Sequence, residues 1–289
     1  MTQIYFRKTI IWGVVIYSCL LFMSCTSLQY RKPDIKIIDE FKKKGVSSEM
    51  YYYQKDELNI NIRVQKVKLS DQDINVVFFH GSPSSLTAWQ EYMGDPALGK
   101  AANLFAIDRP GYGYSNFGKA MPSIEEQAVL INAVVKDLKL DNIITIGTSY
   151  GGSLAARLAV LNKNVKGVIL LSAAMDPIQE KDIWASRFTR WWLTRWIVPT
   201  GYRVAGDEKK VHSFELKKIE KDWNNLKTPV LHLHGSDDNV VPVGNLKYTD
   251  SIFPNSTIKL IPKIGHNLAW ERIDIVKPEI LKFIDTVFN

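Results

Sequence analysis

Short runs of apolar residues alternate with longer amphipathic stretches along most of the chain. The runs have the length of strands that are buried on both faces. They are Val76–Phe79, Leu104–Ile107, Ile143–Ile146, Val168–Leu171 and Val230–Leu233, with a weaker run at Thr257–Ile261 and an alternating, half-exposed strand at Asn59–Val67. Helical periodicity is found at Ile124–Leu138, Ser149–Leu161, Leu246–Phe253 and Ile275–Phe288. Strands that alternate with helices predict a mostly parallel sheet covered by helices on both faces.

One long gap breaks this alternation. Residues 173–226 separate two buried strands by about 54 residues, whereas the loops of such folds usually have about two to six. We therefore predict an α/β core formed by residues 49–172 and 227–289, with a helical cap inserted over 173–226.

The predicted cap is rich in tryptophan and arginine. Its aromatic residues are Trp184, Phe188, Trp191, Trp192 and Trp196, and Arg187, Arg190 and Arg195 lie between them. This spacing predicts a helix from about Trp184 to Trp196 with an aromatic face. Three uses of that face compete: Trp184, Phe188, Trp191 and Trp192 line a substrate pocket, they turn outward as a membrane-facing lid, or they only pack the cap.

The N-terminus has the pattern of a targeting segment. Arg7 and Lys8 precede an uncharged apolar run from Ile10 to Met23, which is short for a membrane span of about 20 residues. The run ends just before Cys25 and resembles a bacterial lipoprotein signal, which implies cleavage after residue 24 and lipidation of Cys25. An uncleaved anchor is the alternative. We expect residues 25–48 to be a tether with one short helix at most, on a protein attached to the bacterial cell envelope and facing the periplasm or the exterior.

The amino-acid composition mainly excludes certain classes of protein and of site. The chain has 289 residues, 46% hydrophobic and 23% charged, as in ordinary globular proteins rather than disordered or fibrous ones. Both cysteines, Cys19 and Cys25, lie in the N-terminal segment, so a disulfide framework or a cysteine-based zinc site in the body is excluded. The 37 basic and 30 acidic residues give a net charge of +7, but the basic residues are scattered, and we expect no nucleic-acid partner.

The chemistry centres on Ser149. The sequence from Gly147 to Gly151 reads Gly-Thr-Ser-Tyr-Gly, a G-x-S-x-G pattern, directly after a buried strand and at the start of a helix. This strand-turn-helix setting exposes a serine hydroxyl at the edge of the sheet. A serine hydroxyl becomes a nucleophile when a base removes its proton and a carboxylate orients that base. Of the five histidines, His266 is the one on a late loop at the expected sheet edge, and we predict it to be the base.

Three aspartates are candidates for the carboxylate. Asp237 and Asp238 follow a strand in the segment His234-Gly-Ser-Asp-Asp-Asn-Val-Val-Pro242, and Asp176 follows the preceding strand. Either Asp237 or Asp238 could face the histidine from the end of its strand, and Asp176 is a third choice.

These motifs together resemble a serine hydrolase of the α/β-hydrolase family. The resemblance runs from about residue 58 to 289 and implies the α/β-hydrolase fold, a mostly parallel eight-stranded sheet with helices on both faces and a small helical cap. It selects Asp238 as the acid. It also implies an oxyanion hole formed by the backbone N–H groups of Tyr150 and of Ser82 in the His80-Gly-Ser-Pro83 segment. Asp108–Ser115 resembles the loop after the family's fourth strand, and we favour a structural role for it.

The resemblance implies acyl transfer through Ser149, without a metal or an organic cofactor. Hydrolysis of a small-molecule carboxylic ester is the leading interpretation. Hydrolysis of an amide, a peptide or a carbon–carbon bond, and acyl transfer to another alcohol, use the same triad and remain open. A non-catalytic envelope binding protein is the alternative from a different class.

Overall fold

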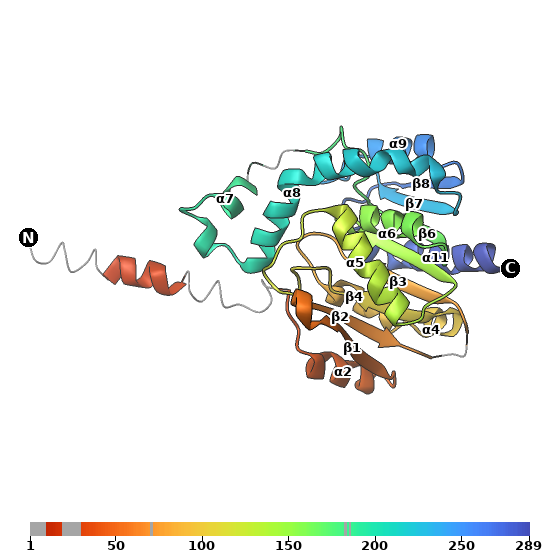
Figure 1. The fold of residues 1–289 in the computed structure, drawn as a ribbon, viewed down its shortest axis with the longest axis horizontal. Helices are drawn as coiled ribbons and strands as arrows, with labels where there is room; N and C mark the ends of the chain where they lie inside the picture. The colour runs from red at the N-terminus through yellow and green to blue at the C-terminus, as the bar shows by residue number, and fades with distance from the viewer. Residues whose placement is uncertain (1–9, 19–29, 70–71, 182–183, 185) are drawn as a thin grey trace, which may run out of the picture.

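The structure is a computed structural model that describes residues 10–18, 30–69, 72–181, 184 and 186–289 (Figure 1). Its centre is one sheet of eight strands in the order β1-β2-β4-β3-β5-β6-β7-β8. The strands are β1 Ser48–Lys55, β2 Ile60–Val67, β3 Asn75–Phe79, β4 Asn103–Ile107, β5 Ile143–Thr148, β6 Val165–Leu171, β7 Val230–Gly235 and β8 Ser256–Ile261. β2 runs antiparallel to β1 and to β4, and all other pairs are parallel. This is the α/β-hydrolase fold, and the predicted fold class is confirmed.

Helices cover both faces of the sheet (Figure 1). The helices of the core are α2 Asp34–Lys43, α3 Gln90–Met93, α4 Pro96–Ala101, α5 Ile124–Asp137, α6 Tyr150–Leu161, α9 Gly244–Ile252, α10 Leu268–Glu271 and α11 Ile273–Phe288, with 3₁₀ turns η1 Asp56–Leu58 and η2 Leu86–Trp89. Successive residues of β3 point to opposite faces, so Val77 packs with α5 and α6 while Val76 packs with α2 and α11. Burial on both faces explains why the central strands are continuous apolar runs.

The expectation of a tether over residues 25–48 needs correction in its second half. Ile37 and Phe41, four residues apart on α2, are buried in the core beneath the sheet. Asp34 at the start of this helix forms an ion pair with the buried Arg63 of β2 at 2.5 Å. The apolar residues at helical spacing were the signal, and they make this segment part of the core. Cys25 and the expected cleavage site lie outside the described residues.

The first strand, β1, was not among the predicted apolar runs. It contains the sequence Ser-Glu-Met-Tyr-Tyr-Tyr-Gln-Lys and is only half-buried, because it lies at the edge of the sheet and pairs with β2 alone. An edge strand of this kind lacks the continuous apolar run of a central strand.

Residues 173–226 lie between β6 and β7 and form α7 Ser186–Arg190, η3 Arg195–Ile197, α8 Thr200–Ile219 and η4 Glu220–Asn225. The predicted helix from Trp184 to Trp196 is wrong. Helix α7 has only five residues, after which Thr194 Oγ1 donates to the carbonyl of Phe188 and the chain turns. Figure 1 shows α7 standing away from the sheet, whereas α8 runs back toward it. In the part of the chain that is described, no helix is long and apolar enough to span a bilayer.

Candidate active site

Ser149 lies at a sharp turn between β5 and α6. Its backbone has φ +52° and ψ −124°, a conformation that costs a residue other than glycine about 1 to 3 kcal/mol. The turn closes tightly, since a Cβ added to Gly147 would lie 2.1 Å from the carbonyl oxygen of Gly151, and one added to Gly151 would lie 2.4 Å from that of Phe79. The flanking glycines are therefore required by close backbone approach. The strain and the glycines together hold the hydroxyl at the carboxyl edge of the sheet.

Asp238 and His266 are in contact. Nδ1 of His266 lies 2.8 Å from Oδ2 of Asp238, while Oδ1 of Asp238 accepts the backbone N–H groups of Val240 and Val241 at 2.9 and 2.8 Å. Burial by itself would raise the pKa of Asp238, but hydrogen bonds from His234 and His266 outweigh it and lower that pKa below its usual range. The carboxylate is thus held ionised and fixed in orientation, as a group that orients a histidine must be.

The other two candidate acids are engaged elsewhere. Asp237 is exposed and accepts a hydrogen bond from the hydroxyl of Ser236. Asp176 is buried, but Oδ1 accepts the N–H of Ile178 and Oδ2 accepts the amide of Gln179. Neither arrangement brings a carboxylate to His266, so the geometry favours Asp238.

A further contact to Asp238 comes from His234, which the sequence analysis did not assign. Its Nε2 lies 3.3 Å from Oδ2 of Asp238 and 3.1 Å from the carbonyl oxygen of Val241. Both neighbours are acceptors, so this nitrogen carries a proton. His234 is fully buried at the end of β7, and it fixes the oxygen of Asp238 that faces His266.

The loop that contains Ser82 passes directly beside the candidate nucleophile. A Cβ added to Gly81 would lie 3.1 Å from Cβ of Ser149, and both cavities described below are lined by Ser82 and Ser149 together. Tyr150 is the first residue of α6, so its N–H is one of the donors at a helix start without a partner in that helix. Both residues predicted for the oxyanion hole therefore border Ser149.

A buried polar network fixes this loop. Arg109 donates to the carbonyls of His80 and Gly81 at 2.9 and 3.1 Å, and its guanidinium pairs with Glu208 of α8 at 2.7 Å. Glu208 also accepts hydrogen bonds from three more side chains, at 2.5 to 3.0 Å: Ser82, Tyr112 and Gln127. Arg109 and Glu208 are fully buried. Sequence reasoning had taken the segment of Arg109 as structural and missed Glu208, because nothing in the pattern of α8 indicates which core residues it meets.

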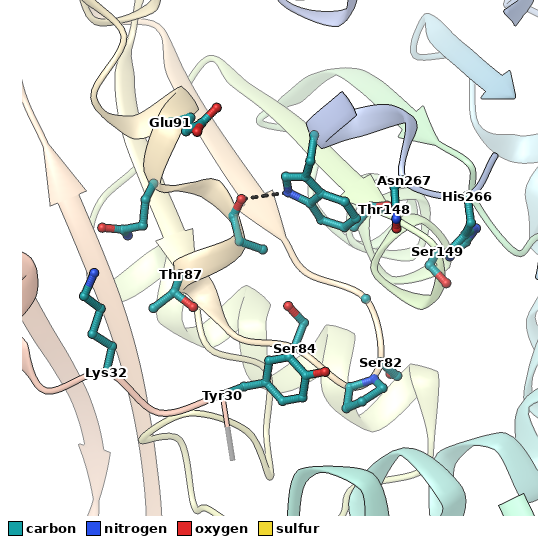
Figure 2. Close-up of a pocket in the computed structure, with 15 residues that line it drawn as sticks. Tyr30, Lys32, Ser82, Ser84, Thr87, Glu91, Thr148, Ser149, His266 and Asn267 are labelled. Carbon is teal, nitrogen blue, oxygen red and sulfur yellow. Dashed lines mark hydrogen bonds between the residues drawn. The ribbon is translucent and has the colours of Figure 1, made fainter. Parts of the chain in front are cut away.

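Two cavities open onto Ser149. The larger, of about 760 Å³, contains His266, Asn267 and Thr148 at one end and Tyr30, Lys32 and Glu91 at the other (Figure 2). The smaller, of about 330 Å³, lies beneath the cap. Its wall is mainly apolar, and it combines Tyr150, Ala174, Val240, Val241 and Pro242 of the core with Tyr202, Ala205, Glu208 and His212 of α8. Ser149 therefore stands between an open chamber and a smaller one.

The aromatic residues predicted to bind substrate do not line either cavity. Trp184, Phe188, Trp191 and Trp192 are exposed at the surface of the cap, between 44 and 77%. From α7 it is Ser186 and Thr189 that face the smaller cavity. The prediction was wrong because α7 turns Ser186 and Thr189 toward the cavity, whereas Phe188 on α7 and the tryptophans on either side of it point to solvent.

Across the described ranges, no group of three or more His, Cys, Asp or Glu residues is arranged to hold a metal ion. The site lies on an alpha/beta hydrolase fold, which solved structures share. Residues 74–197 match the model of the family described as alpha/beta hydrolase fold.

Curated relatives are similar to most of the chain at low identity. The chain is 25% identical to a non-heme chloroperoxidase of Burkholderia pyrrocinia, over 72% of this chain and 91% of the other, and 20% identical to a 2-hydroxy-6-oxo-2,4-heptadienoate hydrolase of Pseudomonas putida, over 69% and 83%. A solved structure titled as a membrane phospholipase A, a bacterial virulence factor, superposes with a TM-score of 0.67 over the whole of both chains at 18% identity, which shows a shared fold.

Proposed function

We propose that the protein is a serine hydrolase that cleaves carboxylic esters through an acyl-enzyme on Ser149. The observation that carries this proposal is the contact between Asp238 and His266 at the rim of the cavity that Ser149 also lines. The nucleophile Ser149 follows β5, the acid Asp238 follows β7 and the base His266 follows β8, each at the carboxyl end of its strand. A structural role does not account for a strained serine beside a histidine that is oriented by a buried carboxylate.

In this mechanism His266 removes the proton from the hydroxyl of Ser149 as its oxygen attacks the ester carbonyl. The N–H groups of Tyr150 and Ser82 stabilise the oxyanion of the tetrahedral intermediate. His266 then donates the proton to the leaving alcohol, and water repeats the sequence on the acyl-enzyme. Asp238 keeps Nδ1 of His266 protonated and stabilises the imidazolium form. Arg109 and Glu208 act through the loop of Ser82, so they are positioning residues.

The two chambers suggest how the substrate lies. The smaller, mainly apolar chamber suits the acyl chain, and the wide chamber suits the alcohol and the incoming water. Both carboxylates of the smaller chamber are paired, Glu180 with Lys209 and His212, and Glu208 with Arg109. Lys181, at the same chamber, donates to the backbone carbonyl of Asn239. An uncharged acyl group of limited length is therefore the substrate class that this chamber favours.

The test is covalent labelling with a fluorophosphonate, followed by turnover of short and long soluble esters. We expect Ser149→Ala and His266→Ala to lose labelling and turnover, and Asp238→Asn to lose about a thousandfold in kcat/KM. Asp237→Asn is the matched control and should stay near the wild type. A wild-type protein that neither labels nor turns over any ester would refute the proposal and favour a binding scaffold.

The relatives suggest two further reactions for the same panel. Peroxide-dependent halogenation tests the activity named for the chloroperoxidase, and cleavage of a vinylogous diketone tests the carbon–carbon bond hydrolysis implied by the name of the heptadienoate hydrolase. An amide substrate and an added alcohol acceptor test the remaining two alternatives. A kcat/KM for one of these above that for every ester would reassign the reaction while leaving the roles of Ser149 and His266 in place.

We also propose that the chain is held at the bacterial cell envelope through a lipid on Cys25. The support is the sequence alone: two basic residues, an apolar run and a cysteine directly after it. Mass spectrometry of the membrane fraction should find a chain that begins at a diacylated Cys25, and Cys25→Ser should abolish that species, with Cys19→Ser as the matched control. Full-length protein in the membrane for both variants would instead indicate an uncleaved anchor.

A further inference from the structure

The outer part of the cap exposes a cluster of large apolar side chains, which we call the aromatic tip. Its members are Trp184, Phe188, Trp191, Trp192, Leu193 and Trp196. Each is at least 44% exposed, and the only other exposed tryptophan among the described residues is Trp12 of the N-terminal segment. Large aromatic side chains are normally buried, and a group of six on a segment of thirteen residues is a patch rather than scattered surface exposure.

Hydrogen bonds within the cap fix the shape of the aromatic tip. Arg195 pairs with Asp207 of α8 at 2.7 Å and donates to the carbonyl of Thr189. The indole of Trp196 donates to the carbonyl of Leu193 at 2.8 Å. Neither α7 nor η3 contains a buried residue. The exposed rings therefore do not hold the cap together, and their exposure calls for a partner outside the chain.

The charges of the aromatic tip identify the chemistry of that partner. Residues 184–197 contain three arginines and no acidic residue. Asp207 compensates the charge of Arg195. The guanidinium of Arg190 donates to the backbone carbonyl and the hydroxyl of Ser186, which are uncharged groups, so its positive charge remains beside the rings. Tryptophan prefers the interface between the headgroups and the acyl chains of a bilayer, and arginine is attracted by anionic headgroups. An anionic phospholipid surface is complementary to both features.

The position of the aromatic tip agrees with this partner. Ser186 and Thr189 on its inner side line the smaller cavity, together with Tyr202. The hydroxyl of Tyr202 is 3.0 Å from that of Tyr30, which lines the larger cavity and is the first described residue after the N-terminal segment. Residues 10–18 expose further apolar side chains and lie on the same side of the molecule as α7 in Figure 1. The aromatic tip thus borders the smaller cavity, and residues 10–18 lie on the same side of the molecule as α7 (Figure 1).

We propose that the aromatic tip is a membrane-docking surface that inserts among the headgroups of an anionic phospholipid bilayer. Docking there places the cavities at the lipid surface, so that a substrate drawn from the bilayer reaches Ser149 without crossing bulk water. The docking surface itself does not depend on the proposed esterase activity, because none of its exposed rings lines the cavities.

The test measures quenching of tryptophan fluorescence by brominated acyl chains. The full chain with Trp12→Phe as background is mixed with vesicles of brominated phosphatidylcholine and phosphatidylglycerol. Trp89 and Trp223 are fully buried, so the aromatic tip supplies most of the emission that lipid can reach. Adding Trp184→Phe and Trp192→Phe together should remove about half of the quenching. Phe214→Leu, an exposed aromatic residue of α8 outside the aromatic tip, is the matched control and should change nothing.

A second variant tests the charge. Arg190→Gln should weaken quenching several-fold in vesicles that contain phosphatidylglycerol and leave it unchanged in pure phosphatidylcholine. Full quenching retained by the Trp184/Trp192 variant would overturn the proposal. So would a vesicle-free dimer that this variant converts to a monomer, because the aromatic tip would then be an interface between two copies of the chain. Turnover of a soluble short ester should stay within about twofold for every variant. A wild type that docks without any turnover would refute the esterase proposal alone.

Discussion

The two parts of the cap, helix α8 and the aromatic tip, have opposite relations to the core. Helix α8 buries two glutamates, Glu208 and Glu215, and one histidine, His212. The aromatic tip leaves four tryptophans in solvent. Polar residues are thus inside and apolar residues outside, which inverts the usual distribution. Glu208 is stabilised inside the protein by Arg109 and three further donors. The rings of the aromatic tip are exposed to solvent instead. The buried polar residues of α8 therefore attach the cap to the core. The exposed apolar residues of the aromatic tip are available for contact with a partner outside the chain.

If α8 attaches the cap to the core, substitution of Glu208 should have the largest effect on stability and turnover. Glu208→Ala leaves the charge of Arg109 buried without its partner, and we expect a loss of about 3 kcal/mol in the free energy of unfolding. The loop of Ser82 also loses its support, so kcat should fall at least tenfold with a smaller change in KM. Urea unfolding and soluble-ester kinetics measure the two effects. Glu215→Gln, on the same helix and paired only with the half-exposed Lys218, is the control and should lose less than about 1 kcal/mol. Equal losses for both variants would show that Glu208 is not a special attachment point.

A second prediction concerns the ion pairs of Glu180 with Lys209 and His212 of α8 and their stability in acid. Burial of Glu180 would raise its pKa, but the charge and hydrogen bond of His212, together with Lys209, lower it from 4.5 to about 2. Because the pKa is lower in the folded chain, the stabilisation is fully present above about pH 4.5 and is lost as the pH falls toward 2. Glu180→Gln should therefore destabilise the protein by about 2 kcal/mol near neutral pH and by progressively less below pH 4.5.

Unfolding midpoints from pH 3 to 7 measure this difference. Glu40→Gln, which removes an exposed ion pair with Lys32, is the control and should be close to neutral throughout. A Glu180→Gln deficit that stays constant down to pH 3 would contradict the assignment.

A smaller effect is expected where the two parts of the cap touch. A Cβ added to Gly206 of α8 would lie 1.7 Å from the hydroxyl oxygen of Thr189 on α7. Gly206→Ala should therefore push α7 away and cost about 1 to 2 kcal/mol, with faster hydrogen exchange in residues 186–197 and unchanged exchange in the sheet. The double variant Gly206→Ala/Thr189→Ala removes the hydroxyl and should recover part of the loss. Failure of the second substitution to restore protection would mean that α7 is held by other contacts.

The smallest effect on stability is expected at the rings themselves. Trp184→Ala and Trp192→Ala should each change the free energy of unfolding by less than about 0.5 kcal/mol, since these side chains are 70 and 77% exposed. A loss comparable to that of a buried tryptophan, about 3 kcal/mol or more, would show that the rings pack the cap after all. Thermal unfolding of the full chain, without vesicles, distinguishes the two outcomes.

The central sheet was predictable because its strands are buried on both faces, which leaves a mark in the local sequence. Val76–Phe79 and Ile143–Ile146 have continuous apolar runs, and the structure places strands over both. The edge strand Ser48–Lys55 was missed, since partial burial removes that mark. In α2 the helical spacing of Ile37 and Phe41 was present, but the charged residues around them favoured the interpretation as a tether.

The site was predictable where a motif constrains the local backbone and not where it depends on distant contacts. Ser149 and His266 each follow a strand that ends at one edge of the sheet, so their meeting could be predicted from the topology. The topology left three aspartates open as the acid, and Asp238 was selected through the resemblance to the family. Glu208 and His234 act through contacts with segments up to 126 residues away or across a loop. No local pattern indicates such partners. For the aromatic cap segment, the helical period predicted a continuous helix that does not form, and it carried no information about what the aromatic side chains face.

The two unequal chambers beside Ser149 have a kinetic consequence for the proposed reaction. In that reaction the alcohol leaves through the larger chamber, so its departure clears the route by which water reaches the acyl-enzyme, while the acid fragment stays in the smaller chamber until the acyl bond is cut. Products then leave in a fixed order, alcohol first and acid last. Excess alcohol should compete with water for the acyl-enzyme and divert turnover to transesterification, whereas excess acid should compete with the substrate for the free enzyme.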